Sequence, residues 1–263
     1  MKTILDFIEA KKNKKKITMI STYDYWSAML CEKAGIDCIL VGDSLGMVIQ
    51  GKETTLPVKL EEMIYHTKAV KKGAPNTFII VDMPFMSYQV NKDEAVKNAG
   101  KILKETGANA VKLEGGEEIA EIVEKMVSVG IPVMGHLGLT PQSVHALGGY
   151  RVQGRTKEQQ KKIIKDSKIL EQAGVFSIVL EAVPSYLAEE ITGFLEIPTI
   201  GIGAGNKTDG QVLVLHDLIG IFETTPKFVK KYMEAGKLIV QSLEKFKQEV
   251  QEGIFPDKEH TYE

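Results

Sequence analysis

Eight short apolar runs rich in β-forming residues recur along this 263-residue chain, and few folds contain that number of such segments. The runs are ITMIST (17–22), CILVGD (38–43), FIIVDMP (78–84), AVKLEG (110–115), VMGHLG (133–138), SIVLEAV (177–183), PTIGIG (198–203) and QVLVLHD (211–217). They are continuously apolar rather than alternating, as expected for parallel strands that are covered on both faces.

Helix-period stretches separate most of these runs, at 61–72, 93–106, 117–129 and 157–173, and a long final helix is predicted within 226–251. Strands that alternate with helices predict an α/β fold, and eight of them favour a closed (β/α)8 TIM barrel over an open doubly wound sheet. Such barrels often contain about 250 residues in one unit. No linker or low-complexity tract divides the chain, so we expect a single barrel domain over 1–263.

The N-terminal segment predicts a short helix before the first strand. The lysine run KKNKKK (11–16) follows it and contains no aromatic residue. Because the net charge of the whole chain is only -2, we interpret this run as a solvated connection rather than a nucleic-acid or membrane surface. We therefore expect neither nucleic acid nor membrane among the partners.

Composition indicates a soluble protein of the cytoplasm. The chain is 43% hydrophobic and 26% charged, and it has no long apolar segment and no secretory signal. Its two cysteines, Cys31 and Cys38, are too few for a disulfide framework or a metal knuckle.

Charged residues stand at the predicted strand ends. They are Asp43, Asp82, Lys112, Glu114, His136 and Glu181. The active site of such a barrel lies at the C-terminal ends of its strands, so four carboxylates are expected around one mouth. They would repel one another unless a cation or a shared proton relieves them.

Oxygen ligands suit a hard divalent ion such as Mg²⁺, which makes Asp43, Asp82 and Glu114 candidate metal ligands. The alternative for Asp43 and Asp82 is that each caps a following helix. Lys112 and Glu114 stand two apart on one strand and point to the same side. They could form a structural ion pair, or Lys112 could hold a substrate carboxylate or an enolate oxygen. His136 could equally be a core residue or a participant.

Two loops are candidates for a functional role. In GIGAGN (201–206) we favour a tight turn that requires glycine over a phosphate cradle. The length of the loop at 136–156 indicates a functional lid or a disordered segment, and we expect it to close over the site. The loop contains the only two arginines of the chain, Arg151 and Arg155. These arginines predict either recognition of a carboxylate or phosphate, or a salt bridge between subunits.

Long motifs in a fixed order resemble the ketopantoate hydroxymethyltransferase family. They are LVGDSLGMVIQGKETTLPV, VDMPF, VKLEGG, GHLGLTPQSVHALGGYRVQGR and GIGAGN. The resemblance runs from about residue 3 to the C-terminus. It implies a TIM barrel of the phosphoenolpyruvate mutase and isocitrate lyase type that binds Mg²⁺. It also implies transfer of a hydroxymethyl group from 5,10-methylenetetrahydrofolate to 3-methyl-2-oxobutanoate, through a Mg-stabilised enolate, to form 2-dehydropantoate in pantothenate and coenzyme A biosynthesis.

The resemblance also assigns roles to residues at matching positions. The metal ligands fall on Asp43, Asp82 and Glu114, and the substrate contacts on Asp43, Ser44, Asp82 and Lys112. The proton acceptor falls on Glu181. Members of the family form homo-oligomers, commonly homodecamers.

Two rival functions remain. A Mg-dependent carbon–carbon lyase that acts on a small 2-oxo or dicarboxylic acid would share the enolate chemistry, but it would commonly use a catalytic cysteine. Neither Cys31 nor Cys38 ends a strand at the predicted mouth. A non-catalytic ligand sensor would keep the glycines and lose the carboxylates.

Overall fold

Eight parallel strands close into a barrel in the computed structural model, which describes residues 3–262. The strands pair in sequence order, and the last pairs with the first. They are β1 (Ile17–Ser21), β2 (Cys38–Val41), β3 (Phe78–Asp82), β4 (Ala110–Glu114), β5 (Val133–Gly138), β6 (Ser177–Glu181), β7 (Thr199–Ile202) and β8 (Gly210–Val214). Each lies within or beside one of the predicted runs, so the predicted TIM barrel is confirmed.

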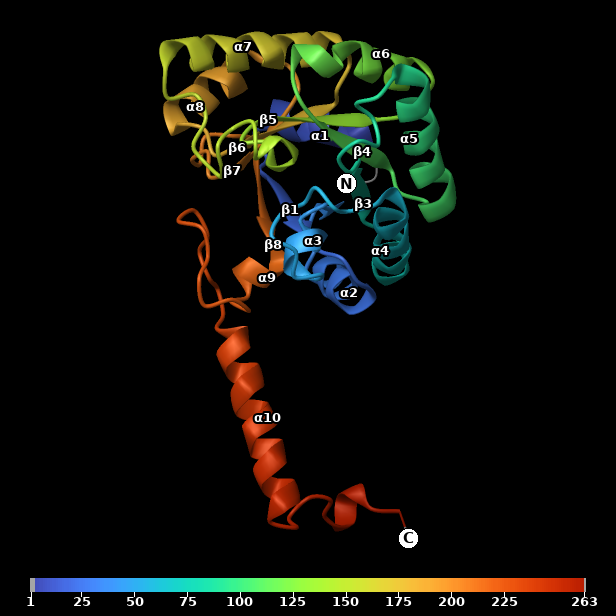
Figure 1. Cartoon of the computed structure of the whole chain (residues 1–263), viewed down its shortest axis with the longest axis vertical. Coiled ribbons are helices and arrows are strands. Elements are labelled where there is room, and N and C mark those ends of the chain that lie inside the picture. Colours follow the sequence, from blue (N-terminus) through green and yellow to red (C-terminus); the bar gives the residue numbers. More distant parts are fainter. Residues whose placement is uncertain (1–2, 263) are drawn as a thin grey trace. The chain divides into compact units, whose positions relative to one another are not determined.

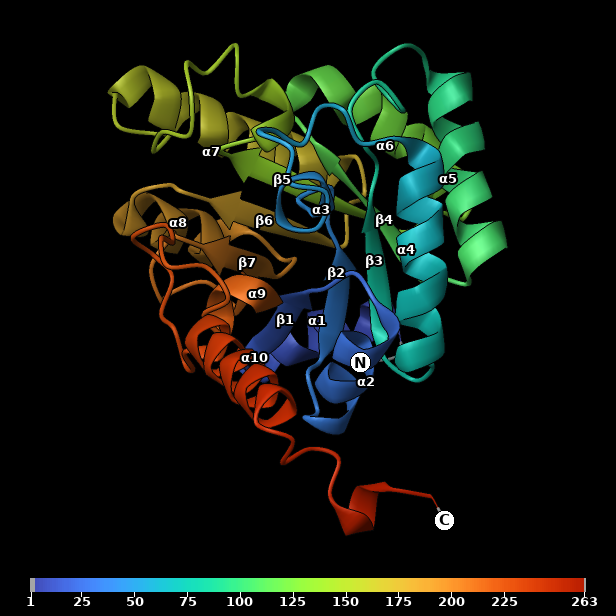
Figure 2. The ribbon, with the colours of Figure 1, turned by 60° about the horizontal axis from the view of Figure 1, so that its bottom comes forward.

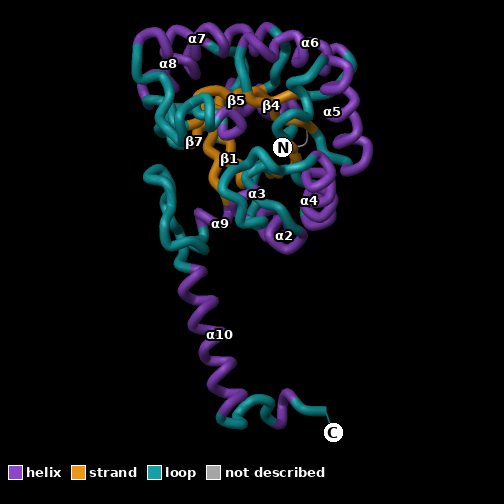
Figure 3. The backbone as a smooth tube through the Cα atoms, viewed as in Figure 1, coloured by secondary structure: helices purple, strands orange, loops and turns teal. Residues whose placement is uncertain are grey.

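Helices surround the strands (Figure 3). They are α2 (Tyr25–Lys33), the single-turn α3 (Leu45–Val48), α4 (Leu60–Gly73), α5 (Lys92–Thr106), α6 (Ala120–Ser128), α7 (Lys157–Gln172) and α8 (Ser185–Phe194). The helices predicted at 61–72, 93–106 and 157–173 are confirmed. The stretch 117–129 instead starts with a 3₁₀ turn, η1 (Glu117–Ile119), before α6.

The predicted short N-terminal helix is confirmed as α1 (Ile4–Lys12), and its Phe7 packs at the N-terminal end of the barrel. Its Phe7 is fully buried and meets Phe78 and Phe176 edge to face, with both ring centroids 5.1 Å away. These aromatic contacts add to the hydrophobic effect of burying the ring. The predicted connection lies between the end of α1 and the start of β1. Within it, Lys14 adopts a positive φ of 54°.

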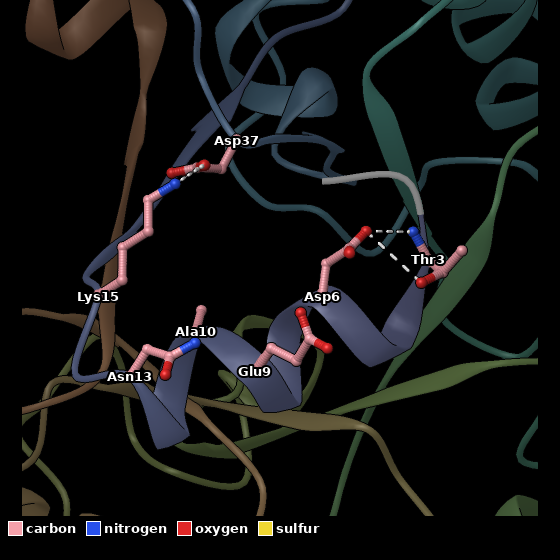
Figure 4. A pocket seen from close by; sticks show the side chains of 7 residues that line it. All are labelled: Thr3, Asp6, Glu9, Ala10, Asn13, Lys15 and Asp37. Atoms are coloured by element: carbon pink, nitrogen blue, oxygen red, sulfur yellow. Dashed lines mark hydrogen bonds and ion pairs between the residues drawn. The ribbon is translucent and has the colours of Figure 1, made fainter.

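A pocket lies beside α1 and is lined by side chains from α1 and from the segments before β1 and β2 (Figure 4). Lys15 and Asp37 approach each other across it at 3.8 Å. Both residues precede their strands, so the pocket belongs to the N-terminal end of the barrel, opposite the charged strand ends.

The chain separates into two compact units after Val214. The second unit contains α9 (Leu215–Leu218), α10 (Ala235–Gln251) and η3 (Lys258–His260), in orange and red in Figure 1. The final predicted helix is therefore present but begins only at Ala235, since backbone hydrogen bonds from Tyr232 to Leu218 and from Ala235 to Ile219 fold the preceding segment back on α9. The expectation of one domain over 1–263 stays a prediction. Within 3–262, no helix is long and apolar enough to cross a membrane.

Candidate active site

The C-terminal ends of five neighbouring strands, β2 to β6 in Figure 2, bring the predicted residues into one network, in which Asp43, Asp82, Lys112, Glu114 and His136 are buried and Glu181 is partly buried. Asp82 ends β3 and pairs in register with Lys112 on β4. Glu114 ends β4 and pairs with His136 on β5. Asp43 follows β2 by two residues, and Glu181 ends β6.

Asp82 links the first half of this network. One of its oxygens, Oδ2, accepts a hydrogen bond from the Asp43 backbone N–H at 3.0 Å. The other, Oδ1, forms an ion pair with Lys112 Nζ at 2.9 Å. Both side chains of this pair are buried, with exposed fractions of 6% and 4%. The lysine is therefore held beside the two aspartates rather than in solvent.

His136 links the second half. Its Nδ1 lies 3.1 Å from Lys112 Nζ and 3.5 Å from Glu114 Oε1. Its Nε2 lies 3.3 Å from Glu181 Oε2. Lys112 thus connects through one imidazole to the carboxylate on β6, which makes His136 a participant in the network.

Neither helix capping by Asp43 and Asp82 nor a Lys112–Glu114 ion pair accounts for the contacts of these residues. Asp43 does not cap α3, because its Oδ2 accepts from the Gln142 side chain. Helix α5 is capped by Asn91 and not by Asp82. The close ion pair of Lys112 joins it to Asp82 rather than to Glu114.

Burial and crowding set the protonation of the carboxylates. Burial, with Asp82 and Glu114 nearby, raises the pKa of Asp43 well above its ordinary value. Burial also raises the pKa of Asp82, although Lys112 opposes this. The pKa of Glu114 is lowered despite its burial, because His136, Lys112 and the Gln142 N–H stabilise the carboxylate. Either a proton on Asp43 or Asp82 or a further cation would relieve this crowding of carboxylates.

Burial also acts on the two basic groups. It would lower the pKa of Lys112, but the carboxylates of Asp82, Glu114 and Asp43 raise that pKa above its ordinary value. Burial and Lys112 would lower the pKa of His136, yet hydrogen bonds with Glu114 and Glu181 raise it to about 9.

Ser44 is held by a second small network. Its Oγ lies 2.8 Å from the hydroxyl of Tyr23, a fully buried residue whose pKa is raised by that burial. Gly42 leaves room for this arrangement. A Cβ at Gly42 would lie 2.8 Å from Ser44 Oγ, 3.0 Å from Ser21 Oγ and 3.4 Å from Asp82 Oδ2.

Gln142 reaches into the network from η2 (Pro141–Ser143), at the start of the long loop. Its Nε2 donates to Asp43 Oδ2 and to the Met83 carbonyl, both at 2.9 Å. Its backbone N–H donates to Glu114 Oε2 at 3.0 Å. Its Oε1 lies 2.9 Å from the Tyr88 hydroxyl.

The backbone around Glu181 is tightly fixed. Its carbonyl accepts from the Leu139 N–H at 2.8 Å, and a Cβ on Gly138 would come within 2.2 Å of that same oxygen. Ala182 then adopts a positive φ of 48°, which is uncommon for a residue other than glycine. Such strain persists only where surrounding structure over-determines the conformation.

Among residues 3–262 no three His, Cys, Asp or Glu side chains form a ready-made metal site. Lys112 engages Asp82, while Gln142 engages both Asp43 and Glu114. The predicted ligand set of Asp43, Asp82 and Glu114 is thus brought to one mouth, and its role in metal binding stays a prediction.

The prediction for the loop GIGAGN (201–206) is confirmed, whereas the predictions for the loop 136–156 are not tested. Gly203 and Gly205 have φ values of 62° and 80°, so GIGAGN contains the tight turn that we favoured. Arg151 and Arg155 are both exposed. Their proposed anion-binding or assembly roles, and closure of the loop, stay predictions.

The family model for ketopantoate hydroxymethyltransferase matches residues 1–258. The chain belongs to the ketopantoate hydroxymethyltransferase family. Curated 3-methyl-2-oxobutanoate hydroxymethyltransferases include one from Aquifex aeolicus, 56% identical over 96% of both chains. Another, from Thermus thermophilus, is 52% identical over 99% of both.

Solved structures place this ketopantoate hydroxymethyltransferase family member in a wider fold group. A 2,3-dimethylmalate lyase of the phosphoenolpyruvate mutase and isocitrate lyase superfamily aligns with a TM-score of 0.62 at 15% identity, covering 99% of this chain and 92% of that one. A phosphonopyruvate hydrolase in complex with oxalate and Mg²⁺ aligns with a TM-score of 0.64 at 12% identity, covering 99% and 93%. These likenesses confirm the predicted barrel type.

Proposed function

We propose that this chain transfers a hydroxymethyl group from 5,10-methylenetetrahydrofolate to 3-methyl-2-oxobutanoate and forms 2-dehydropantoate for pantothenate and coenzyme A biosynthesis. The observation that carries the proposal is the link through His136 between Lys112 and Glu181. This link brings a buried ammonium group and a carboxylate to one mouth, which supports the proposed pairing of a substrate-binding cation with a base. A 2-oxo acid whose oxygens lie at Lys112 could therefore present its C3 hydrogen to Glu181.

The donor set fits a divalent cation. Mg²⁺ is usually held by one or two carboxylates, while waters and substrate oxygens complete its shell, so three protein ligands are not required. Asp43, Asp82 and Glu114 supply hard oxygen atoms, and their mutual repulsion would be relieved by a positive ion. When bound, Mg²⁺ would polarise the ketone of the substrate. A structure of the same fold, phosphonopyruvate hydrolase, is a complex with oxalate and Mg²⁺.

Different side chains of the protein take different roles in the reaction. The Ser44 hydroxyl and the Lys112 ammonium bind substrate oxygens, and Glu181 removes the C3 proton. The electron pair of the C3–H bond forms the enolate. Its C3 attacks the methylene carbon of the folate as the first of the two C–N bonds of that carbon breaks, and the freed nitrogen takes the proton from Glu181. Water then replaces the second nitrogen, so its oxygen becomes the hydroxyl group, its proton goes to that nitrogen, and tetrahydrofolate leaves.

We further propose that the protein is a cytoplasmic homo-oligomer, in the form of a homodecamer. Helix α10 exposes the apolar side chains Leu238, Ile239, Val240, Leu243, Phe246 and Val250, and exposed apolar patches commonly mark protein interfaces. Cys31 and Cys38 are free thiols, which a reducing compartment preserves.

The lyase alternative has less support. Cys31 lies buried in α2, and Cys38 begins β2 at the end of the barrel opposite the mouth. Neither thiol can reach a substrate held at Lys112.

A product assay tests the proposal. The protein should convert 3-methyl-2-oxobutanoate and 5,10-methylenetetrahydrofolate into 2-dehydropantoate, detected by mass spectrometry, in the presence of Mg²⁺. Chelation should abolish product formation, and added Mg²⁺ should restore it. Cleavage of a 2-oxo or dicarboxylic acid without product from the folate would support the lyase instead.

A further inference from the structure

Gln142 is the one side chain outside the predicted set that forms a hydrogen bond with the Asp43 carboxylate within residues 3–262. It is 6% exposed, although glutamine is mostly a surface residue. The long loop that carries it offers many polar residues, yet this one is turned inward. A buried amide is tolerated when all of its hydrogen-bonding groups have partners.

The partners of Gln142 also fix which way its amide points. The Met83 carbonyl and the Asp43 carboxylate are acceptors, so they require the Nε2 side. The Oε1 side accepts from Tyr88 at 2.9 Å and from Gln89 at 3.1 Å. Both amide hydrogens thereby have acceptors, the single Tyr88 O–H lies within reach of both Gln142 Oε1 and the Glu114 carbonyl, and a flipped amide would set oxygen against oxygen.

We propose that Gln142 is a positioning residue that orients the Asp43 and Glu114 carboxylates toward a divalent cation, an inference that rests on the proposed function. It donates through its side chain to one oxygen of Asp43 and through its backbone to one oxygen of Glu114. The other oxygen of Glu114, Oε1, lies 3.5 Å from His136 Nδ1. Ligating carboxylates are typically held by such outer hydrogen bonds, whose loss weakens metal affinity by about 10- to 100-fold.

Tyr88 extends this support. It is 1% exposed, accepts from the Glu114 N–H at 3.1 Å and contacts Gln142 Oε1. It therefore joins the backbone of one proposed ligand to the side chain that orients the other.

Isothermal titration with Mg²⁺ tests the inference. Gln142→Met keeps length and bulk and keeps the backbone N–H to Glu114, but it loses the side-chain donor to Asp43, so its Kd for Mg²⁺ should rise about 10- to 100-fold. Gln153→Met is the matched control, because Gln153 lies in the same loop and its amide donates to the Arg151 carbonyl at 3.0 Å and to no carboxylate within residues 3–262. Its Kd should equal that of the wild type.

Thermal unfolding of the metal-free proteins separates positioning from mere stability. A lower Tm in Gln142→Met with an unchanged Kd would overturn the inference, and so would a tighter Kd, since Gln142 would then compete with the cation. If Gln142→Met does not fold, Tyr88→Phe decides by the same titration and must bind Mg²⁺ more weakly. A wild-type protein that binds no Mg²⁺ overturns both this inference and the proposed metal site.

Discussion

Each charged side chain at the mouth is held by a residue from another strand or loop. Asp43 can be buried because it has specific partners, with the Gln142 amide on its carboxylate and the Asp82 carboxylate on its backbone N–H. An unpartnered buried carboxylate would cost far more free energy than a folded domain can spare. At the residue scale, the site depends on these specific partners and on small residues such as Gly42, which lets Ser44, Ser21 and Asp82 lie close together.

Gly42 gives a test at this scale. In Gly42→Ala the new Cβ would lie 2.8 Å from Ser44 Oγ and 3.0 Å from Ser21 Oγ, so Ser44 must move. We expect the free energy of unfolding to fall by about 1–3 kcal/mol, the usual cost of overpacking, and KM for the oxo acid to rise. Denaturant titration and steady-state kinetics measure the two effects.

Gly100→Ala is the matched control, since its Cβ would meet nothing within 4 Å in helix α5. Alanine is favoured over glycine in a helix by roughly 0.5–1 kcal/mol, so this variant should be slightly more stable with unchanged kinetics. Equal kinetic effects in both variants would contradict the role given to Gly42.

Sequence reasoning located the charged residues but not what holds them. Asp43, Asp82, Glu114 and Glu181 end predicted strands, and the barrel rule places such ends together. Gln142 gave no comparable signal, because a polar residue in a loop is ordinarily solvent-exposed. Only the three-dimensional path of the loop turns it inward.

At the scale of elements, α1 stabilises the barrel by packing at the N-terminal ends of its strands. Phe7→Ala would remove a fully buried ring that contacts Phe78 and Phe176. The expected loss is about 3–5 kcal/mol in the free energy of unfolding, from lost burial and the cavity left behind. Leu5 on the same helix is 67% exposed, so Leu5→Ala should change stability by less than about 0.5 kcal/mol. Similar losses in both variants would show that α1 does not pack as described.

Glu32 ties α2 to the segment before β3 and predicts a pH effect. Its slight burial would raise its pKa, but hydrogen bonds from Thr77 and Asn76 lower it below the ordinary value of 4.5. A carboxyl group whose pKa is lower in the folded state stabilises the protein above its unfolded pKa. That contribution is lost as pH falls through the folded pKa.

Glu32→Gln should therefore be less stable than the wild type at pH 7, and the difference should shrink as the pH falls below about 4. Denaturant titrations across this range measure it. Glu53→Gln, at an exposed position, should show no comparable trend. A difference for Glu32→Gln that stays constant down to about pH 3 would contradict the carboxylate contacts.

Strands were predicted more completely than helices. Buried parallel strands are continuously apolar, which makes their runs visible in the sequence. Helix α2 was not predicted, because YWSAMLCEK lacks a clear apolar stripe and leaves Trp26 51% exposed. Helix α8 was also not predicted, and it follows Pro184 without a side-chain cap. The strand predicted over 211–217 is too long at its C-terminal end, because its last three residues, LHD, belong to α9.

At the scale of the whole molecule, the proposed assembly is open to direct measurement. A homodecamer should sediment with about ten times the chain mass of 29.1 kDa. Replacing the apolar residues Leu243 and Phe246 of α10 by glutamate should reduce that mass, because charged residues are depleted from interface cores. Lys245→Glu, on the same helix and 77% exposed at its side chain, provides the control. A wild-type protein that sediments as a single chain would rule out the assembly.

Proton abstraction is the central step of the proposed chemistry, and it can be observed without the folate. In D₂O with Mg²⁺, the protein should exchange the C3 hydrogen of 3-methyl-2-oxobutanoate for deuterium, seen by NMR as loss of that signal and collapse of the methyl splitting. Glu181→Gln should bind the oxo acid but not exchange it, because an amide cannot accept the proton at neutral pH. No exchange in the wild type, either alone or with a non-reactive folate present, would contradict the proposed function. Exchange that persists in Glu181→Gln would contradict the assignment of Glu181 as the base.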